Sequence, residues 1–468
     1  MIITCSFVKY IKYLKHSSRR VPTRGATSYS AERWKASKME GEQAPASRDD
    51  PVIMKLDTPE FRTIFTPELK TLAGLFEKYN YEIRIAGGAV RDILMGIRPK
   101  DLDFATTATP NEMKDMFTKE EIRMINMKGE QHGTITSRIN DAENFEITTL
   151  RIDVATDGRH AKVEFTKDWK LDANRRDLTI NSMFLGLDGT VYDYFFGYED
   201  LKKRRIAFVG NAETRIQEDY LRILRYFRFY GRIAENPDVH DAATLQAIRR
   251  NVQGLDRVAG ERIWTEWHKI MAGRFPVELT TKMIECELSR HIGLPEKPDV
   301  AAFLEVHKRA EENGVRLRAI SLISALLKDQ EEVMLLHGRL KLSAFDRDLA
   351  LFLVQHRVVT PSEKPLKIYQ KLVIMPKGKN QGIKEFVCEL FRYRGDLELL
   401  RVFADWQPPR FPVGGDQLRQ HVKGGKLMGL VITRLKERWI DSDFQLDREE
   451  LLKLVPNIVE EINDDIQK

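Results

Sequence analysis

The chain has 468 residues, of which 42% are hydrophobic and 31% are charged, a balance that can bury a core and excludes an intrinsically disordered protein. No stretch approaches the roughly 18 consecutive apolar residues of a membrane-spanning helix, so we expect no membrane association. The net charge of +6 permits a polyanionic partner without requiring one, and the three cysteines form neither a CxxC zinc pattern nor an even disulfide framework.

Residues 1–50 are predicted to be a mitochondrial targeting segment followed by a polar linker. No acidic residue precedes Glu32, apolar residues recur at helical spacing between lysines, and serine and threonine are frequent over 17–30. A basic, amphipathic, serine-rich start without acids is typical of mitochondrial targeting. The alternative is a disordered basic tail that helps to bind RNA. Met39 offers a downstream start, which predicts a second, cytosolic or nuclear pool without the signal.

The rest of the chain is predicted to be α+β, with an α/β head over 51–195 and a helical remainder. Alternation of apolar and polar residues, or short apolar runs, predicts strands at 81–86, 101–105, 122–126, 133–139 and 144–151. Helices are predicted over 89–95 and from Thr109-Pro110, where a capping threonine, a proline and Glu112 follow one another. From about residue 200 the periodicity is helical, and we divide it into a neck (196–270), a body (271–360) and a tail (361–468).

Two acidic residues in the head are candidate metal ligands. Asp101 and Asp103 stand two apart in a strand-like segment, so we expect both carboxylates on the same face. Glu146 alternates with apolar neighbours in another strand and would face the same way as a third carboxylate. Oxygen ligands suit Mg²⁺, and carboxylates that share magnesium ions are what phosphoryl transfer requires. A DxD pair alone is more often a solvated turn.

A glycine-rich turn precedes this pair and is a candidate phosphate-binding element. Gly87 and Gly88 follow a predicted strand and open a predicted helix, so backbone N–H groups can approach an anion. Arg91, one turn later, could grip an oxygen of a triphosphate. A Gly-Gly turn by itself is usually only a turn, but the succession GGAVRD, eight residues and DLD is far rarer.

The succession of motifs resembles the class II CCA-adding tRNA nucleotidyltransferases, relatives of the polymerase-β superfamily, and most closely their animal mitochondrial type. The resemblance is strongest over about 80–265 and extends to PPRFPVGGDQL at 408–418. The segments that carry it are GGAVRDILMGIRPKDLDFAT (87–106), DGRH (157–160), RRDLTINSMF (175–184), DYFFGYEDL (193–201), EDYLRILRYFRF (218–229) and GERIW (260–264).

The resemblance implies a polymerase-β-like head with a mixed sheet and an all-α neck, body and tail. It implies template-independent addition of C, C and A to the 3′ end of tRNA from CTP and ATP, with Mg²⁺ and release of pyrophosphate. Asp101 and Asp103 would be the metal ligands, with Glu146 in support, and Gly88, Arg91 and Arg176 would touch the nucleotide. The tail would help to bind tRNA, and the oligomeric state stays open between monomer and homodimer.

The resemblance gives the base-reading role to Asp219 and Arg222. These residues are three apart, and we expect them on one face of a helix, where the alternative to base reading is an intrahelical ion pair. Cytosine and adenine both carry an amino group beside a ring-nitrogen acceptor, so a carboxylate and a guanidinium can pair with either base. Arg225 and Arg228 are expected to contact the triphosphate or RNA, and Asn181 either orients the nucleotide or is a capping or turn residue.

Two alternatives remain open from the sequence. A poly(A) polymerase, or an enzyme that adds only CC or only A, would share the same short motifs. A non-catalytic RNA-binding protein on this fold is less favoured because the candidate catalytic residues are retained. The segment at 118–131 is either a mobile loop that changes between C and A addition or an ordinary hairpin loop.

Overall fold

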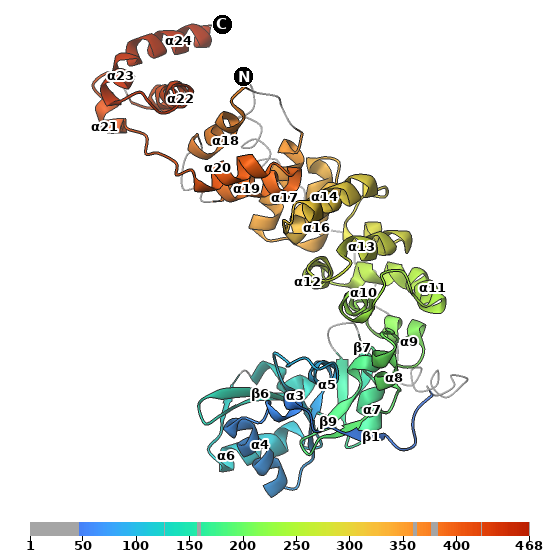
Figure 1. Ribbon diagram of the computed structural model, residues 1–468. Helices are drawn as coiled ribbons and strands as arrows, with labels where there is room; N and C mark the ends of the chain where they lie inside the picture. Colours follow the sequence, from blue (N-terminus) through green and yellow to red (C-terminus); the bar gives the residue numbers. More distant parts are fainter. Residues whose placement is uncertain are drawn as a thin grey trace, which may run out of the picture. The chain divides into compact units, whose positions relative to one another are not determined.

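The computed structural model describes residues 46–125, 127–156, 161–358, 363–375, 382–422 and 424–467, which belong to one compact unit. The predicted targeting segment and the DGRH motif at 157–160 lie outside the described residues. Strands are confined to the N-terminal part and helices follow to the end, so the α+β prediction is confirmed (Figure 1). No helix of the described chain is both long and apolar enough to cross a bilayer.

The head is built on an eight-stranded mixed sheet with the strand order β1-β10-β9-β2-β3-β6-β5-β4. Its strands are β1 (Val52–Lys55), β2 (Ile83–Ala86), β3 (Asp103–Thr106), β4 (Arg123–Ile125), β5 (Thr134–Ile139), β6 (Glu143–Thr149), β9 (Phe184–Gly186) and β10 (Thr190–Tyr192). Only β3 and β6 pair in parallel, and β7 (Arg151–Thr156) and β8 (Ala161–Phe165) form a separate two-stranded sheet. The parallel pair is the part of the sheet that matters for the site.

The helices of the head begin and end with the expected local signals. They are α3 (Pro59–Arg62), α4 (Pro67–Lys78), α5 (Gly88–Leu94), α6 (Pro110–Lys119) and α7 (Trp169–Asn174), with the 3-10 helices η1 (Met127–His132) and η2 (Thr179–Asn181). Thr109 and Glu112 form a full capping box at α6, as predicted. The segment predicted as a loop at 118–131 contains β4 and η1, and Glu130 is tied to Lys114 of α6 by an ion pair. Its movement stays a prediction.

One predicted strand boundary is wrong. β3 begins at Asp103, whereas Asp101 lies in an exposed bend before it. The two residues therefore do not share a strand face, and the argument that placed both carboxylates side by side fails for Asp101. The physical reason is that β2 pairs with β3 only as far back as Phe104, so no partner strand extends the ladder to Asp101.

The helical remainder starts with α8. The neck helices are α8 (Gly197–Lys202), α9 (Ala212–Glu218), α10 (Arg222–Ile233), α11 (Ala242–Asn251), η3 (Val252–Arg257) and α12 (Gly260–Met271). The next helices are α13 (Pro276–Glu285), η4 (Ser289–Ile292), α14 (Val300–Glu312), α15 (Ala319–Ile323), η5 (Ser324–Leu326), α16 (Gln330–Leu340) and α17 (Ala344–His356). The last are α18 (Pro365–Ile374), α19 (Ile383–Arg394), α20 (Leu397–Asp405), α21 (Gly415–Leu418), α22 (Lys426–Asp441), α23 (Arg448–Lys453) and α24 (Val455–Gln467).

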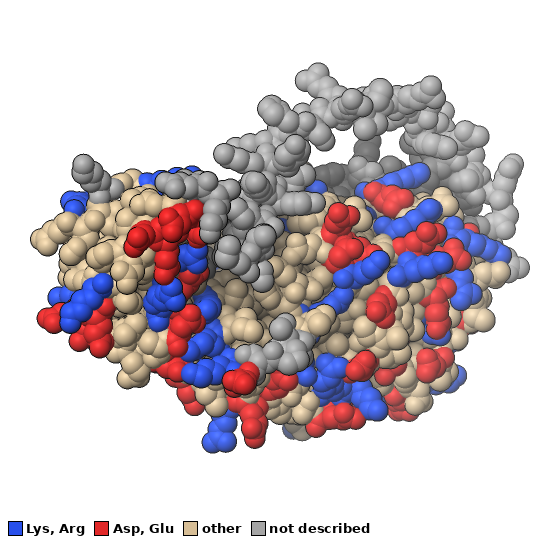
Figure 2. All heavy atoms as spheres, turned by 90° about the horizontal axis from the view of Figure 1, so that it is seen from above, with Lys and Arg blue, Asp and Glu red and all other residues tan. Residues whose placement is uncertain are grey.

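Buried side chains form a large cluster from the head through α20, a small cluster around Trp169 and Phe184, and a separate cluster over residues 413–462. The aromatic residues of α10, Tyr226, Phe227, Phe229 and Tyr230, are all buried, which confirms that they belong mainly to the core. Cys286 and Cys388 are buried free thiols. Basic and acidic side chains are interspersed over the face in Figure 2, so no field of one sign covers it.

Candidate active site

A cleft of about 1650 Å³ is lined by residues of the head, of the neck and of the helices after it. This exceeds the volume of roughly 300–1,000 Å³ usual for a small-ligand pocket, so it has room for a nucleotide and part of a second substrate. The predicted site residues that line it are Gly88, Arg91, Asp103, Glu146, Arg176, Asn181, Asp219, Arg222, Arg225 and Arg228. Asp101 is the one predicted site residue that is absent from the lining.

Asp103 and Glu146 form the acidic centre of the cleft. They are register partners on the parallel strands β3 and β6, so their side chains leave the same face of the sheet. Both are exposed to the cleft, while their neighbours Phe104, Phe145 and Ile147 are buried beneath the sheet, as the alternation in the sequence predicted. Cleft walls still exclude much of the water around Asp103. This lost solvation, followed by the charges of Glu146 and Asp101, raises the pKa of the Asp103 carboxyl.

The acidic centre fits a magnesium ion that is completed by substrate. Among the described residues, no group of three acidic, histidine or cysteine side chains is close enough to hold a metal by itself. Magnesium usually takes one or two carboxylates and fills its other positions with waters and substrate phosphates. Two adjacent carboxylates with oxygen ligands only, one of them with a raised pKa, match that requirement, because a divalent cation would relieve their repulsion.

The glycine turn lies at the end of β2, beside this centre. Gly87 has φ 67° and ψ −121°, which only glycine adopts readily, and Gly88 starts the seven-residue helix α5. A Cβ on Gly87 would approach Nη1 of Arg176 to 3.1 Å. The turn therefore needs glycine at position 87 for its backbone and for space, while the sequence prediction had singled out Gly88.

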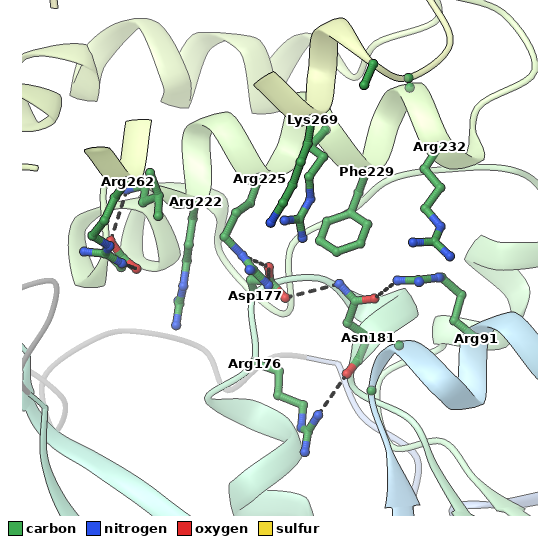
Figure 3. Close-up of a pocket in the computed structure, with 18 of the residues that line it drawn as sticks. Arg91, Arg176, Asp177, Asn181, Arg222, Arg225, Phe229, Arg232, Arg262 and Lys269 are labelled. Atoms are coloured by element: carbon green, nitrogen blue, oxygen red, sulfur yellow. Dashed lines mark hydrogen bonds and ion pairs between the residues drawn. The ribbon is translucent and has the colours of Figure 1, made fainter. Parts of the chain in front are cut away.

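Asn181 connects three charged residues at the base of the cleft (Figure 3). Nη1 of Arg91 donates to its Oδ1 at 2.6 Å, its Nδ2 donates to Asp177 at 3.4 Å, and Arg176 donates to its main-chain oxygen at 3.2 Å. Arg91 is 2% exposed. Asn181 is the last residue of η2 and is not one of its caps, so it is a turn residue, and its contact with the nucleotide stays a prediction.

Two buried aspartates hold the arginines of the cleft. Asp172 accepts hydrogen bonds from Arg175 and Arg176, and Asp177 accepts one from Arg225 at 2.6 Å. Burial alone would raise the pKa of both carboxyls, but the neighbouring guanidinium groups outweigh it and keep both pKa values below the usual range. Neither aspartate was singled out from the sequence, although Asp177 lies within the RRDLTINSMF segment.

Asp219 and Arg222 do not share a helix, which corrects the sequence prediction. α9 ends at Glu218, Asp219 has an extended backbone, and α10 begins at Arg222. Asp219 pairs with Arg262 of α12 at 3.2 Å, and Arg222 pairs with Glu218 at 2.7 Å. The intrahelical Asp219–Arg222 ion pair is therefore absent from this described segment. Both side chains line the cleft, each held by another residue.

Arg225 and Arg228 extend from α10 toward the cleft, but each is already paired with an acid. Arg228 donates to Glu266 of α12 at 2.9 Å, as Arg225 does to Asp177. The guanidinium of Arg228 lies 4.2 Å from the ring centroid of Phe229, and those of Arg91 and Arg225 lie 5.1 and 5.5 Å from it. These contacts fix the arginines in position before any ligand binds. The sequence offered no signal for Glu266 or Arg262, since both lie on a separate helix.

Two segments of the chain match described families. Residues 83–207 match the poly A polymerase head domain. Residues 241–301 match a family described as the probable RNA and SrmB- binding site of polymerase A. The first range covers every strand of the eight-stranded sheet except β1 and contains Asp101, Asp103 and Glu146. The second covers α11 to the beginning of α14.

Similarity to known tRNA-processing enzymes extends over most of the chain. The chain is 50% identical over 407 residues to the mitochondrial CCA tRNA nucleotidyltransferase 1 of Mus musculus and, to the same extent, of Homo sapiens, which covers 86% of this chain and 93% of each relative. Its fold is similar to that of the Bacillus stearothermophilus CCA-adding enzyme, solved in complex with CTP. The TM-score is 0.63 at 22% identity, over 88% of this chain and all of the other.

Proposed function

This chain belongs to the CCA tRNA nucleotidyltransferase family, and on that premise we propose how the residues of its cleft perform the reaction. The chain adds C, C and A to the 3′ end of tRNA, with CTP and ATP as substrates. It is a mitochondrial enzyme. A poly(A) polymerase or a binding protein without activity is not favoured. The observation that carries the proposal is the in-register Asp103–Glu146 pair beside the glycine turn.

In this proposal Asp103 and Asp101 hold magnesium, with Glu146 beside them. When bound there, magnesium would neutralise charge on the reacting phosphate and assist ionisation of the 3′ hydroxyl of tRNA. Asp101 lies in an exposed bend outside the cleft lining, so its carboxylate has to turn toward Asp103 to take part. Its charge already acts on Asp103, since it contributes to the raised pKa of that carboxyl.

The nucleotide is held by groups that are fixed in advance. Arg91 and Arg176 both donate hydrogen bonds to Asn181, which fixes their guanidinium groups before the nucleotide binds. Binding of a triphosphate therefore costs little side-chain conformational entropy. Gly87 and Gly88 let the main chain approach the phosphates closely. Arg225 and Arg228 carry the remaining positive charge along α10, where a pyrophosphate leaving group would be stabilised.

The base is read by Asp219 and Arg222. Their side chains line the cleft from the junction of α9 and α10. Asp219 is oriented by Arg262, and Arg222 is oriented by Glu218 and by the main-chain oxygens of Arg175 and Arg215. A carboxylate accepts from the exocyclic amino group of cytosine or adenine, and a guanidinium donates to the ring nitrogen. Uracil and guanine place a carbonyl against the carboxylate, and such a mismatch can cost a factor of about 10⁴.

Incorporation on a tRNA that lacks its last three nucleotides tests the proposal. CTP, ATP, UTP and GTP are supplied singly and together, with and without magnesium. We expect CCA to be added only with magnesium, and growth to stop there. Unlimited addition of A would contradict the assigned specificity, and no addition at all would contradict the assigned chemistry.

We also propose that the helices from residue 361 onward contribute to tRNA binding. A further part of the proposal is a second pool of the enzyme that is translated from Met39 and lacks the targeting segment. Western blotting of cytosolic, nuclear and mitochondrial fractions tests the pool. Two forms that differ by about forty residues are expected, and one form in one compartment would contradict it.

A further inference from the structure

Two arginines of the cleft differ from all the others in their partners. Every other arginine in the lining forms an ion pair with a carboxylate, namely Arg91, Arg151, Arg175, Arg176, Arg222, Arg225, Arg228, Arg232 and Arg262. Arg274 and Arg316 form none with any described residue, although both line the same cleft and both are exposed. Their charges are therefore the ones that the described fold leaves without a counter-charge.

Both guanidinium groups are held by main-chain oxygens near one turn. Arg274 follows α12 and donates to the oxygens of Ala234 and Glu235, at 2.8 and 3.4 Å, where α10 ends. Arg316 precedes α15 and donates to the oxygen of Ala272 at 3.1 Å, where α12 ends. Because Ala272 is only two residues before Arg274, both arginines belong to the same part of the cleft wall.

A structural role alone accounts for part of this arrangement. A cation at a helix C-terminus satisfies carbonyl oxygens that have no helical partner and opposes the negative end of the helix dipole. That role uses one or two of the five N–H donors of each guanidinium. The capping contacts hold the two guanidinium groups in place, and the other N–H donors of Arg274 and Arg316 are not used by these contacts.

Lys269 adds a third cation to the same wall. It lies in the last turn of α12, and its Nζ is 3.7 Å from Glu266, which also pairs with Arg228 at 2.8 Å. One carboxylate thus faces two cations, so it can balance only one of them. Figure 3 shows Lys269 extending from α12 beside Arg225 and Phe229.

We propose that Arg274 and Arg316, with Lys269, bind backbone phosphates of the RNA strand that leads to the 3′ end. This inference rests on the proposed function and assigns a site for its second substrate. Guanidinium forks match phosphate oxygens and read no base, which suits an enzyme that accepts tRNAs of different sequence. The nucleotide's own phosphates are provided for by Arg91 and Arg176 from the head, so the unbalanced cations near the C-terminal end of α12 remain for the RNA.

The test is the affinity of the full-length protein for a tRNA that lacks its last three nucleotides, measured by filter binding at several salt concentrations. For the double variant Arg274→Gln/Arg316→Gln we expect Kd to rise about five- to tenfold. The slope of log K against log salt should become shallower by about 1–2, since each lost phosphate contact releases one fewer counterion. In turnover, KM for tRNA should rise and KM for CTP should not.

Three controls separate the outcomes. Lys70→Gln removes an equally exposed cation on α4, outside the cleft, and should leave the salt slope unchanged. Arg274→Lys/Arg316→Lys keeps the charges but weakens the helix caps, so it should retain most of the slope. If the Gln double variant melts early, the single variant Arg316→Gln, which loses one carbonyl contact, gives the same slope measurement.

An unchanged slope in a folded Gln variant would overturn the inference, and so would a Lys variant that loses as much slope as the Gln variant. Failure of the unaltered chain to add CCA would instead contradict the proposed function, which the binding experiment does not measure.

Discussion

Glu146 lies directly beside Asp103 across the only parallel strand pair in the described head sheet. Neighbouring strands are about 4.8 Å apart, so the two carboxylates repel each other unless a cation lies between them. The raised pKa of Asp103 reflects lost solvation first and then this repulsion. In the folded chain Asp103 and Glu146 therefore repel each other, and a divalent cation bound between them would replace this repulsion with attraction.

Replacing Asp103 should separate activity from folding. Asp103→Asn removes a metal ligand, and we expect nucleotide addition to fall roughly a thousandfold or more, since several kcal/mol of charge stabilisation depend on the metal. The unfolding midpoint should stay the same or rise, because a repulsion with Glu146 is removed. Thermal melting with and without MgCl₂ checks this, and magnesium should raise the midpoint of the unaltered chain but not that of the Asn variant. Glu77→Gln, on α4 and exposed, is the matched control. Full activity of the Asn variant would disprove the metal assignment.

Asp219 should matter more for the choice of nucleotide than for the fold. Asp219→Ala removes the carboxylate that would face the amino group of cytosine or adenine, so discrimination against UTP and GTP should drop by about 10²- to 10⁴-fold. The variant also loses the Arg262 pair and a hydrogen bond from the N–H of Leu221, which predicts a loss of about 1–2 kcal/mol in stability. Competition assays with mixed nucleotides measure the first effect. Glu261→Gln, an exposed acid on α12, should change neither. Retained discrimination in a folded Ala variant would refute base reading by this residue.

Most of the head could be predicted because its signals are local. The capping residues of α6, the alternation that exposes Glu146 and buries Phe145, and the succession of glycines and acids are all readable in the sequence. The head residues that these signals single out, Gly88, Arg91, Asp103 and Glu146, all line one cleft. Asp101 was misplaced because the end of a strand depends on its pairing partner, which the sequence does not show.

The junction of α9 and α10 could not be predicted. The run from Glu218 to Phe229 has continuous helical periodicity with no glycine or proline, so it reads as one helix. Tertiary contacts interrupt it. Asp219 reaches across to Arg262 on α12, and the ring of Tyr220 occupies the space that a Cβ on Gly254 would need. Asp177 and Glu266 were missed for the same reason, since an acid that orients an arginine from another element has no sequence signature. Asp172 stands three and four residues before Arg175 and Arg176, a spacing that could have revealed it.

Asn181 should prove to be a positioning residue for the nucleotide. Asn181→Ala leaves Nη1 of the buried Arg91 without its 2.6 Å acceptor and removes the Nδ2 donor to Asp177, while the main-chain oxygen that accepts from Arg176 stays. We expect a stability loss of about 1–3 kcal/mol and a rise of roughly tenfold or more in KM for CTP and ATP. KM for tRNA should change far less. Thr179→Ser, on the same 3-10 helix, keeps its hydroxyl bond to Asp200 and serves as the control. An equal rise in KM for the nucleotides and for tRNA would indicate a general loss of structure instead.

His240 should make the stability of the neck depend on pH. Its Nδ1 lies 2.9 Å from the Tyr226 hydroxyl, and its ring stacks on Tyr230 with centroids 3.9 Å apart. Burial, followed by the charge of Lys282, lowers the pKa of His240 from 6.5 to about 4, against smaller opposing effects of Asp238 and Glu285. The unfolded chain therefore binds a proton near pH 6.5 while the folded chain stays neutral, so stability is present above that pH and is lost as the pH falls toward 4.

Between pH 7.5 and pH 5 this histidine should cost the folded state about 2 kcal/mol, at 1.4 kcal/mol for each unit below 6.5. Urea unfolding of the unaltered chain and of His240→Gln at both values measures the effect as a difference, since other acid-sensitive groups are common to both. The Gln variant lacks the titrating group, so its stability should fall by about 2 kcal/mol less over this interval. His421→Gln, at an exposed position, should behave like the unaltered chain. Equal pH dependence in all three proteins would mean that His240 is already protonated in the fold, which the packing of its ring between the tyrosines of α10 opposes.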